Sequence, residues 1–456
     1  MCQPTKAPTK AQHVVGASTM PKVSSIATGD IKKDAKEDEA LQHGTLYGSL
    51  SLALIIAGFS LTMPHLQSRR DALQCDSLCY GSMTSTRSAL SLVGGFFVSR
   101  LSDNDSSFVA RTIGGGSGRK ACLYIGTVAS IIGLVIGGAT FSILGMYLSM
   151  VPGALFQQNF SVLKALLADL HDAASSSTGA RAGSVGKLGM SVGLAFMFGP
   201  VMGATLIKTF EHAVGLAIVL TGMSMIMVAK LPSTTSTKAP DTTKTKKGIL
   251  SFLDIKAART PAAMFLMSVR VCMALAFHIY MTIWTVSLSQ RFQFGPKDHG
   301  FFMSFIGLTY ALSQGVVAKR VVKPLGPTGR IRVIQLCCIA LGAGRYFAFH
   351  TQSLPVVYSV FACIITALGV LNTILTADTA SLASPEEIGG LYGVLESVES
   401  VAGICGPIAG GSLALIDPIG APLAAVVGLY FIVFLLGTFG YDVLIIRGKS
   451  APKKAV

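Results

Sequence analysis

Residues 83–101 read MTSTRSALSLVGGFFVSRL, and residues 303–321 read MSFIGLTYALSQGVVAKRV. The two stretches lie 220 positions apart and share their first Met, a Gly twelve positions later and an Arg near the end. A second pair, Gly199-Pro200-Val201-Met202-Gly203 and Gly406-Pro407-Ile408-Ala409-Gly410, lies 207 positions apart. The smaller second offset implies extra residues in the first half, where the Gly-rich stretch 104–117 supplies them. The sequence therefore predicts that the second half of the chain repeats the first.

The composition places this repeat in a membrane. Charged residues make up 13% of the 456 residues, against about 25% in soluble proteins. Apolar residues make up 51%, and the mean hydropathy is +0.60. These values exclude a soluble multidomain enzyme, a disordered chain and a disulfide scaffold. The expected fold class is an all-α polytopic membrane protein, with 12 transmembrane helices arranged as two six-helix repeats.

Apolar stretches of about 20 residues, the length that crosses a bilayer, alternate with short polar ones. The expected spans are 44–65, 78–101, 120–139, 143–169, 186–207, 212–230, 262–288, 299–321, 331–350, 354–381, 389–415 and 421–446. They give two six-helix bundles, 44–230 and 262–446, joined by a Ser/Thr/Lys-rich linker at 231–261. Residues 1–43 are expected to be a disordered tail, and residues 447–456 a second tail.

The positive charges predict the orientation. With the N-terminus in the cytoplasm, 28 Lys and Arg residues lie on the cytoplasmic side and 5 on the other side. This bias predicts that both termini are cytoplasmic. It also accounts for the net charge of +15, so no nucleic-acid partner is expected. The sequence does not indicate which cellular membrane holds the protein.

The nine cysteines show no metal-ligand spacing, and neither a metal nor a cofactor is expected. Cys75 and Cys79 flank a short loop before the second span, and we expect them to be unpaired thiols rather than a disulfide. The glycines of residues 114–120 do not form a phosphate-binding loop between a strand and a helix, so ATP-driven transport is not expected.

Two motifs resemble the major facilitator superfamily over residues 44–446. Its loop pattern G-x-x-x-D-R-x-G-R-[RK] is matched in two parts, by Arg100 and Asp103, then by Arg119 and Lys120. Ser99 stands where the family has glycine, and about fourteen residues separate the parts. The resemblance implies a membrane transporter, usually monomeric, whose loop motif clamps the cytoplasmic side closed; the insertion alters the geometry of that clamp.

The G-P-x-x-G pattern, common in the family's antiporters, occurs twice. It comprises Gly199, Pro200 and Gly203 in the fifth span, and Gly406, Pro407 and Gly410 in the eleventh. Glycine lets helices approach closely and proline bends them, so hinge-like motion and ordinary packing are both open. Short matches such as 152–155 and 300–308 are most similar to the organic-cation-transporter-like (solute carrier 22 member 18-like) branch. That branch usually has an arginine where this chain has Met150.

Four charged residues inside the expected spans are candidates for proton coupling: Glu399, Glu396, Arg87 and Arg270. A charge near the bilayer centre costs about 3 kcal/mol and is usually paired or lines a wet cavity. Glu399 lies within about 5 Å of the middle of its span and is the first candidate proton carrier. A fixed ion pair between Glu399 and Arg87 or Arg270 is the alternative. Arg345, near the outer end of its span, is expected to snorkel.

Other polar and aromatic residues are candidates for the wall of a substrate cavity. One face of the seventh span carries a stripe of Phe277, Tyr280, Met281 and Trp284. Such a stripe could bind an organic cation, although it more often packs a core. The candidates are Gln157, Gln158, Asn159, His278, Tyr280, Trp284, Tyr310 and Asn372. The sequence thus predicts a secondary transporter of a small organic solute, such as an organic cation or drug-like molecule, working by alternating access as a proton-coupled antiporter. A non-transporting receptor or scaffold on the same fold is the alternative; an enzyme is not expected.

Overall fold

The computed structural model describes residues 27–102, 104–173, 178–232, 256–322, 326–382 and 388–447. Residues 1–26 of the first expected tail, residues 448–456 of the second, most of the linker and Asp103 lie outside these residues. Nine helices among them are long and apolar enough to span a membrane by composition alone, and helix pairs or a more polar helix supply the other three crossings. The protein is a multi-pass, all-helical membrane protein with twelve crossings.

The first half crosses six times. Its helices are α1 (Ala27–Ala72), α2 (Ser77–Ser102), α4 (Gly118–Ala139), the pair α5 (Ile143–Phe156) and α6 (Asn159–Ala173), α7 (Thr178–Leu206) and α8 (Phe210–Ala229). The expected insertion carries a short extra helix, α3 (Phe108–Thr112), after which Gly115 and Gly116 adopt positive φ. Hydroxyl caps begin several helices: Ser142 accepts from the N–H of Gly145, and Thr209 from that of His212.

The second half repeats this order. It comprises α9 (Pro261–Phe292), α10 (Pro296–Leu312) continued by a π-turn and α11 (Ala318–Val322), α12 (Pro327–His350), α13 (Leu354–Ala380), α14 (Ile388–Ile416) and α15 (Gly420–Phe439) followed by a second π-turn. Ion pairs at corresponding positions of the two halves reflect the repeat. Arg119, at the start of α4, pairs with Asp169, and Arg330, at the start of α12, pairs with Asp378 at 3.3 Å.

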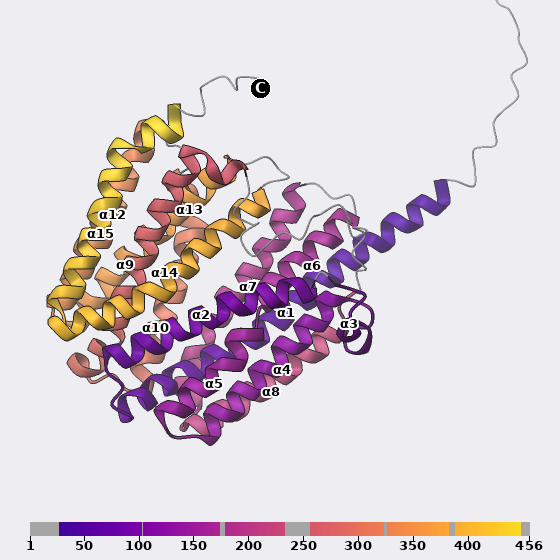
Figure 1. Ribbon diagram of the computed structural model, residues 1–456, viewed down its shortest axis with the longest axis horizontal. Coiled ribbons are helices and arrows are strands. Elements are labelled where there is room, and N and C mark those ends of the chain that lie inside the picture. Colours follow the sequence, from indigo (N-terminus) through magenta and orange to yellow (C-terminus); the bar gives the residue numbers. More distant parts are fainter. Residues whose placement is uncertain are drawn as a thin grey trace, which may run out of the picture.

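The two halves meet along α2 and α14, which run side by side in Figure 1. We call the end at which α8 stops and α9 starts the linker end, and the end at which α1 stops and α2 starts the far end. The helix axes of the two halves converge at the far end and diverge toward the linker end (Figure 1). The structure is thus closed at the far end.

Two proline–glycine contacts of the same kind close this interface. A Cβ on Gly300 of α10 would lie 2.6 Å from the Pro200 carbonyl oxygen of α7. A Cβ on Gly81 of α2 would lie 2.3 Å from the Pro407 carbonyl oxygen of α14. Each contact therefore requires glycine, because a side chain would collide with backbone. Each half contributes one proline and one glycine to the pseudo-symmetric interface.

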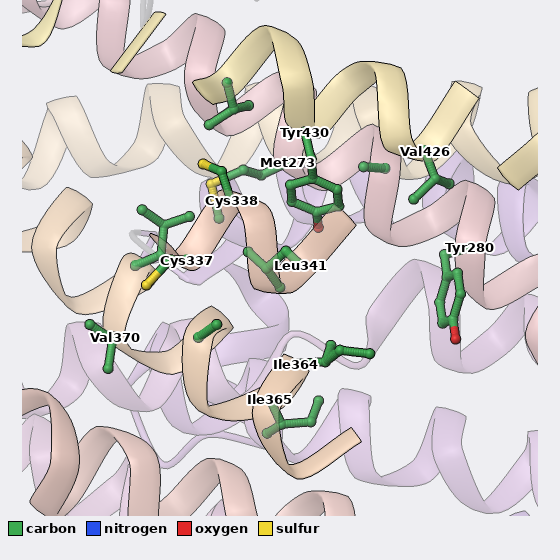
Figure 2. Close-up of a cluster of buried hydrophobic side chains, with 14 of the residues drawn as sticks. Met273, Tyr280, Cys337, Cys338, Leu341, Ile364, Ile365, Val370, Val426 and Tyr430 are labelled. Atoms are coloured by element: carbon green, nitrogen blue, oxygen red, sulfur yellow. The ribbon is translucent and has the colours of Figure 1, made fainter. Parts of the chain in front are cut away.

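Each half has its own apolar core. The core of the second half packs α9, α12, α13 and α15 around Leu341, Ile364 and Val426 (Figure 2). Arg345 lies in this core at 2% exposure, with its guanidinium 5.1 Å from the Tyr280 ring and 4.7 Å from the Tyr430 ring. The expectation that it snorkels is therefore wrong, because two aromatic faces and the Leu341 carbonyl hold the cation inside.

Three local features differ from the expected pattern. The helix of the first span starts at Ala27, inside the tail that was expected to be disordered. It continues past residue 65 to Ala72, because Pro64 is accommodated inside it. The fourth span is broken between α5 and α6 at Gln157 and Gln158.

Cys75 and Cys79 form a disulfide with Cα atoms 5.3 Å apart, so the expectation of free thiols is wrong. The turn at Gln74, with φ of 55°, brings the two cysteines together.

Candidate functional site

A cavity of about 370 Å³ lies against α1, α2, α4, α5 and α8 of the first half and is bounded by α9 and α10 of the second. It extends from Arg69 at the far end to Gln157 and Thr221 nearer the middle of the bundle. Its position between the halves is where transporters of this architecture bind their solutes.

Three arginines line this cavity. Arg87 projects from the middle of α2 and is exposed, and no described residue forms a hydrogen bond or ion pair with it; its guanidinium lies 5.0 Å from the Phe59 ring. Arg70 is close enough to Arg87 to interact with it electrostatically, and it lies over Tyr80 at 4.8 Å. Two like charges facing one cavity repel each other, so an anion between them would be stabilised.

Arg69 is held more rigidly than the other two. It is 7% exposed, and its guanidinium lies 4.4 Å from the Phe210 ring and 4.9 Å from the Phe141 ring. One Nη donates to the Thr140 carbonyl, while Nε and the other Nη are buried with no hydrogen-bond partner. Unpaired buried donors are unfavourable, so the N–H groups on these two nitrogens are available for an acceptor that enters the cavity.

The other residues that line the cavity are uncharged, and several of them are flexible. Among the described residues that line the cavity there is no aspartate or glutamate. Six of the lining residues are methionines, namely Met63, Met83, Met146, Met150, Met281 and Met303. Methionine side chains are flexible and polarisable, and they adapt to apolar bodies of different shapes. The cavity thus combines a positive charge with an adaptable apolar wall.

The break between α5 and α6 opens on this cavity. Gln157 lines it, whereas Gln158 turns away to donate to the Ser91 carbonyl and hydroxyl oxygens at 3.1 and 3.2 Å. Asn159 is 3% exposed and donates to the Leu123 carbonyl at 3.4 Å. Of the three amides expected in the cavity, only Gln157 lines it, because the other two secure the broken helix to α2 and α4.

A second polar cluster lies in the other half. Arg270 forms an ion pair with Glu399 at 3.4 Å and donates to Asn372 at 3.1 Å and Thr376 at 2.7 Å. Tyr310 completes it, because its hydroxyl accepts from Gln314 at 2.6 Å and from Asn372 at 3.5 Å. Glu399 is 41% exposed and Arg270 is 11% exposed, so the carboxylate can be reached by water. The side chain of Glu396 lies outside the described residues.

The aromatic stripe expected in the cavity lies elsewhere. Tyr280 and Trp284 are 2% and 1% exposed, stack on each other and pack in the core of the second half. Tyr280 and Trp284 are therefore not part of the cavity wall. The alternative, that the stripe packs a core, is the one observed, because large aromatic rings are most stable when buried. His278 packs against α14, where a Cβ on Gly406 would lie 2.7 Å from the His278 Cβ. Only Met281 of that stripe lines the cavity.

The described residues of the loop motif stay within the first half. Arg119 pairs with Asp169 and donates to the Ser102 hydroxyl at 3.3 Å. Lys120 donates to the Leu231 carbonyl at 2.9 Å and the Ala229 carbonyl at 3.2 Å. Arg100 lies 4.2 Å from the Phe96 ring. These contacts hold α4 against α2, α6 and the end of α8.

The glycines of the repeated G-P-x-x-G pattern are contact points within each half. A Cβ on Gly199 or Gly203 would collide with Ser60 or with the Leu61 carbonyl of α1. A Cβ on Gly410 would lie 3.1 Å from the Ile279 Cα of α9, so this glycine also packs against backbone. The fifth and eleventh spans therefore pack closely on the first and seventh.

The sequence does not predict Arg69 and Arg70 as cavity residues. They fall in a predicted loop, because the first span is predicted to end at residue 65, one residue after Pro64. The helix continues to Ala72, and its last turns direct both arginines to the cavity. The signal that could have found them is the short polar gap of residues 66–77, which leaves room for a longer helix.

Comparison with known proteins agrees with this architecture. Residues 48–407 match the family model of the Major Facilitator Superfamily. The chain is 23% identical to mouse solute carrier family 22 member 18 over 80% of this chain and 87% of that protein. It is 25% identical to bovine major facilitator superfamily domain-containing protein 10 over 65% of this chain and 66% of that one. The crystal structure of the human organic anion transporter MFSD10 superposes with a TM-score of 0.62 at 19% identity, covering 87% of this chain and 99% of that one.

Proposed function

This chain belongs to the major facilitator superfamily of membrane solute transporters, and we propose that it carries small organic anions across the membrane by alternating access. The observation that supports this proposal is the charge of the cavity. Three arginines line it, and the described lining residues include no carboxylate. An anion would neutralise their mutual repulsion, whereas the organic cation expected from the sequence would add to it.

The unpartnered donors point to a carboxylate or a similar oxyanion. Arg69 offers buried N–H groups without an acceptor, and Arg87 is exposed to the cavity. A guanidinium binds a carboxylate through two parallel hydrogen bonds, which makes it suited to this class of ligand. The methionine wall favours a carboxylate attached to an apolar body over a small hydrophilic acid. A relative of similar fold is described as an organic anion transporter.

Alternating access would use the interface described above. In this structure the halves meet at the far end, so the cavity would next open there by separation of the Pro200–Gly300 and Pro407–Gly81 contacts. The loop motif that contains Asp103, Arg119 and Lys120 would act at the opposite end, where it would hold the linker end closed in the other state. The two proline–glycine contacts lie on helices, as do Arg119 and Lys120, which suits rocking of one half against the other.

Proton coupling would use Glu399, with Glu396 as the second candidate. Arg270 holds the Glu399 carboxylate in this state. If the pair separates in the other state, the carboxylate loses its partner and can take up a proton. Arg270 would then remain bound to Asn372 and Thr376, which keeps the cation solvated. Exchange of protons for the organic anion follows from such a cycle.

The orientation proposed from the basic loops has independent support. The Cys75–Cys79 disulfide lies at the far end, in the turn between α1 and α2. Disulfides persist in oxidising compartments and are rare in the cytosol. The far end would therefore face the cell exterior or an oxidising lumen, and both termini would be cytoplasmic. The state described here would then be open toward the cytoplasm.

Binding to the purified protein tests the choice of an anion. Three ligands with one apolar body are compared: 1-naphthylacetate, its neutral amide and 1-naphthylethylammonium, at equal ionic strength. We expect the carboxylate to raise the unfolding temperature most and to bind at least about tenfold more tightly than the amide, since a charged hydrogen bond contributes about 1.5–3 kcal/mol. Stronger binding of the ammonium would overturn the proposal and restore the organic cation.

A further inference from the structure

A polar cluster joins the two halves at the far end. The Ser289 hydroxyl of α9 lies 2.6 Å from Asp71 Oδ2 of α1 and 3.2 Å from His299 Nε2 of α10. Gln67, one turn before Asp71, donates to Asp71 Oδ1 at 3.1 Å. We call Asp71, Ser289 and His299 the far-end latch. Because Asp71 belongs to the first half and the other two belong to the second, this cluster must separate before the far end can open.

With Asp71 ionised, the hydrogen bonds of the latch require a proton on His299 Nε2 but none on Nδ1. An ionised aspartate only accepts, so the single Ser289 hydroxyl proton points to Asp71. Ser289 can then only accept from His299, whose Nε2 must carry a proton. A neutral imidazole protonated at Nε2 satisfies all of these bonds. The latch is therefore complete with Asp71 ionised and His299 neutral.

A second proton on His299 would meet an unfavourable environment. His299 is 2% exposed and lines the cavity that contains Arg69, Arg70 and Arg87. The carboxylates near it are Asp71 and Asp298. Both are already engaged, Asp71 by Gln67 and Ser289, and Asp298 by the backbone N–H of Gly295 at the start of α10.

The other groups packed against the imidazole do not offset this charge. Phe294 contacts it edge-on with ring centroids 5.3 Å apart, and the nearby Tyr80 of α2 lies under the Arg70 guanidinium. A buried imidazolium loses its hydration, and Asp71 and Asp298, which already accept other hydrogen bonds, offset only part of that loss, whereas an open far end would hydrate it.

We propose that the far-end latch is a proton-sensitive gate, closed while His299 is neutral and released when His299 takes up a proton. Acid then favours the state open at the far end. An organic anion in the cavity, which His299 lines, would attract the imidazolium and stabilise it within the closed state. A bound anion in the cavity should therefore reduce the opening that acid causes. This consequence rests on the proposed function, whereas the pH response of the empty protein does not.

Hydrogen–deuterium exchange of the full-length protein in nanodiscs tests the gate. Exchange is followed in peptides covering residues 66–74 and 286–300 at about pH 8 and about pH 5.5, which bracket the ordinary histidine pKa of about 6.5. After correction for intrinsic rates, we expect the opening constant of the native protein to rise with acid, by up to about tenfold per pH unit for one linked proton. His299→Gln keeps an N–H donor for Ser289 but does not titrate, so its opening constant should stay constant.

Two variants control this experiment. His350→Gln changes an exposed histidine near the end of α12 that bonds only to the Tyr346 carbonyl among the described residues, and it should keep the native response. Ser289→Ala removes the bridge and should give fast exchange at both pH values. A native protein without a pH response, or a His299→Gln variant that keeps it, would overturn the proposal. If 1-naphthylacetate does not change the opening constant in acid while the pH response of the empty protein remains, the proposed anion function fails and the proposed gate stands.

Discussion

Replacing Arg87 with glutamine is expected to lower the affinity for an organic anion by about 10- to 150-fold. The guanidinium is exposed to the cavity in the middle of α2 and has no described carboxylate partner, so its charge is available to a ligand. A hydrogen bond to a charged group contributes about 1.5–3 kcal/mol, which gives this range. Uptake of labelled anion by proteoliposomes, measured as a function of concentration, gives the change as a rise in KM.

Two matched variants show whether the loss comes from the site. Arg332→Gln removes an exposed positive charge from α12, outside the cavity, so uptake should be unaltered. Arg87→Lys keeps the charge but loses the two parallel hydrogen bonds, and we expect an intermediate KM. Equal KM values for the native protein and Arg87→Gln would remove Arg87 from the substrate site.

Replacing Glu399 with glutamine is expected to abolish accumulation driven by a proton gradient while leaving downhill exchange of the anion. Glutamine resembles the protonated carboxyl in shape but cannot release a proton. It also cannot form the ion pair with Arg270, so the variant would move through the transport cycle without a change of protonation. Accumulation and exchange are measured in the same proteoliposomes with a labelled anion and a pH-sensitive dye.

Asp417→Asn is the control for this change. Asp417 lies between α14 and α15, where the N–H groups of Ile419 and Gly420 donate to it and hold its pKa below the usual range. It lies away from the cavity, and its replacement should leave accumulation intact. If Glu399→Gln still accumulates the anion against its gradient, another group carries the proton, and Glu396 would be tested next.

The sequence predicted the architecture well because hydropathy and repeat spacing record which segments cross the membrane. The twelve spans, the parallel repeat and the close-packed glycines of the fifth and eleventh spans all have counterparts in the structure. The extent of the first helix was underestimated because membrane helices accommodate proline, as Pro64 shows in α1. That single boundary removed Arg69 and Arg70 from the predicted site.

The candidate site was less predictable because a helical stripe identifies a face but not its partner. Tyr280 and Trp284 share a face of α9, and that face packs into the core of the second half rather than the cavity. The break at Gln157 and Gln158 was also hidden, since polar amides inside an apolar run fit a continuous helix that faces a cavity as well as a broken helix. Arg270 and Glu399 could be identified as an alternative ion pair, because isolated charges within spans require partners.

Uptake by the native protein tests the central claim most directly. Proteoliposomes receive labelled 1-naphthylacetate, its amide or 1-naphthylethylammonium at equal concentration, with protein-free liposomes measuring passive entry. We expect protein-dependent uptake of the carboxylate, saturable and inhibited by other apolar carboxylates, and none of the ammonium. Protein-dependent uptake of the ammonium in preference to the carboxylate would contradict the account.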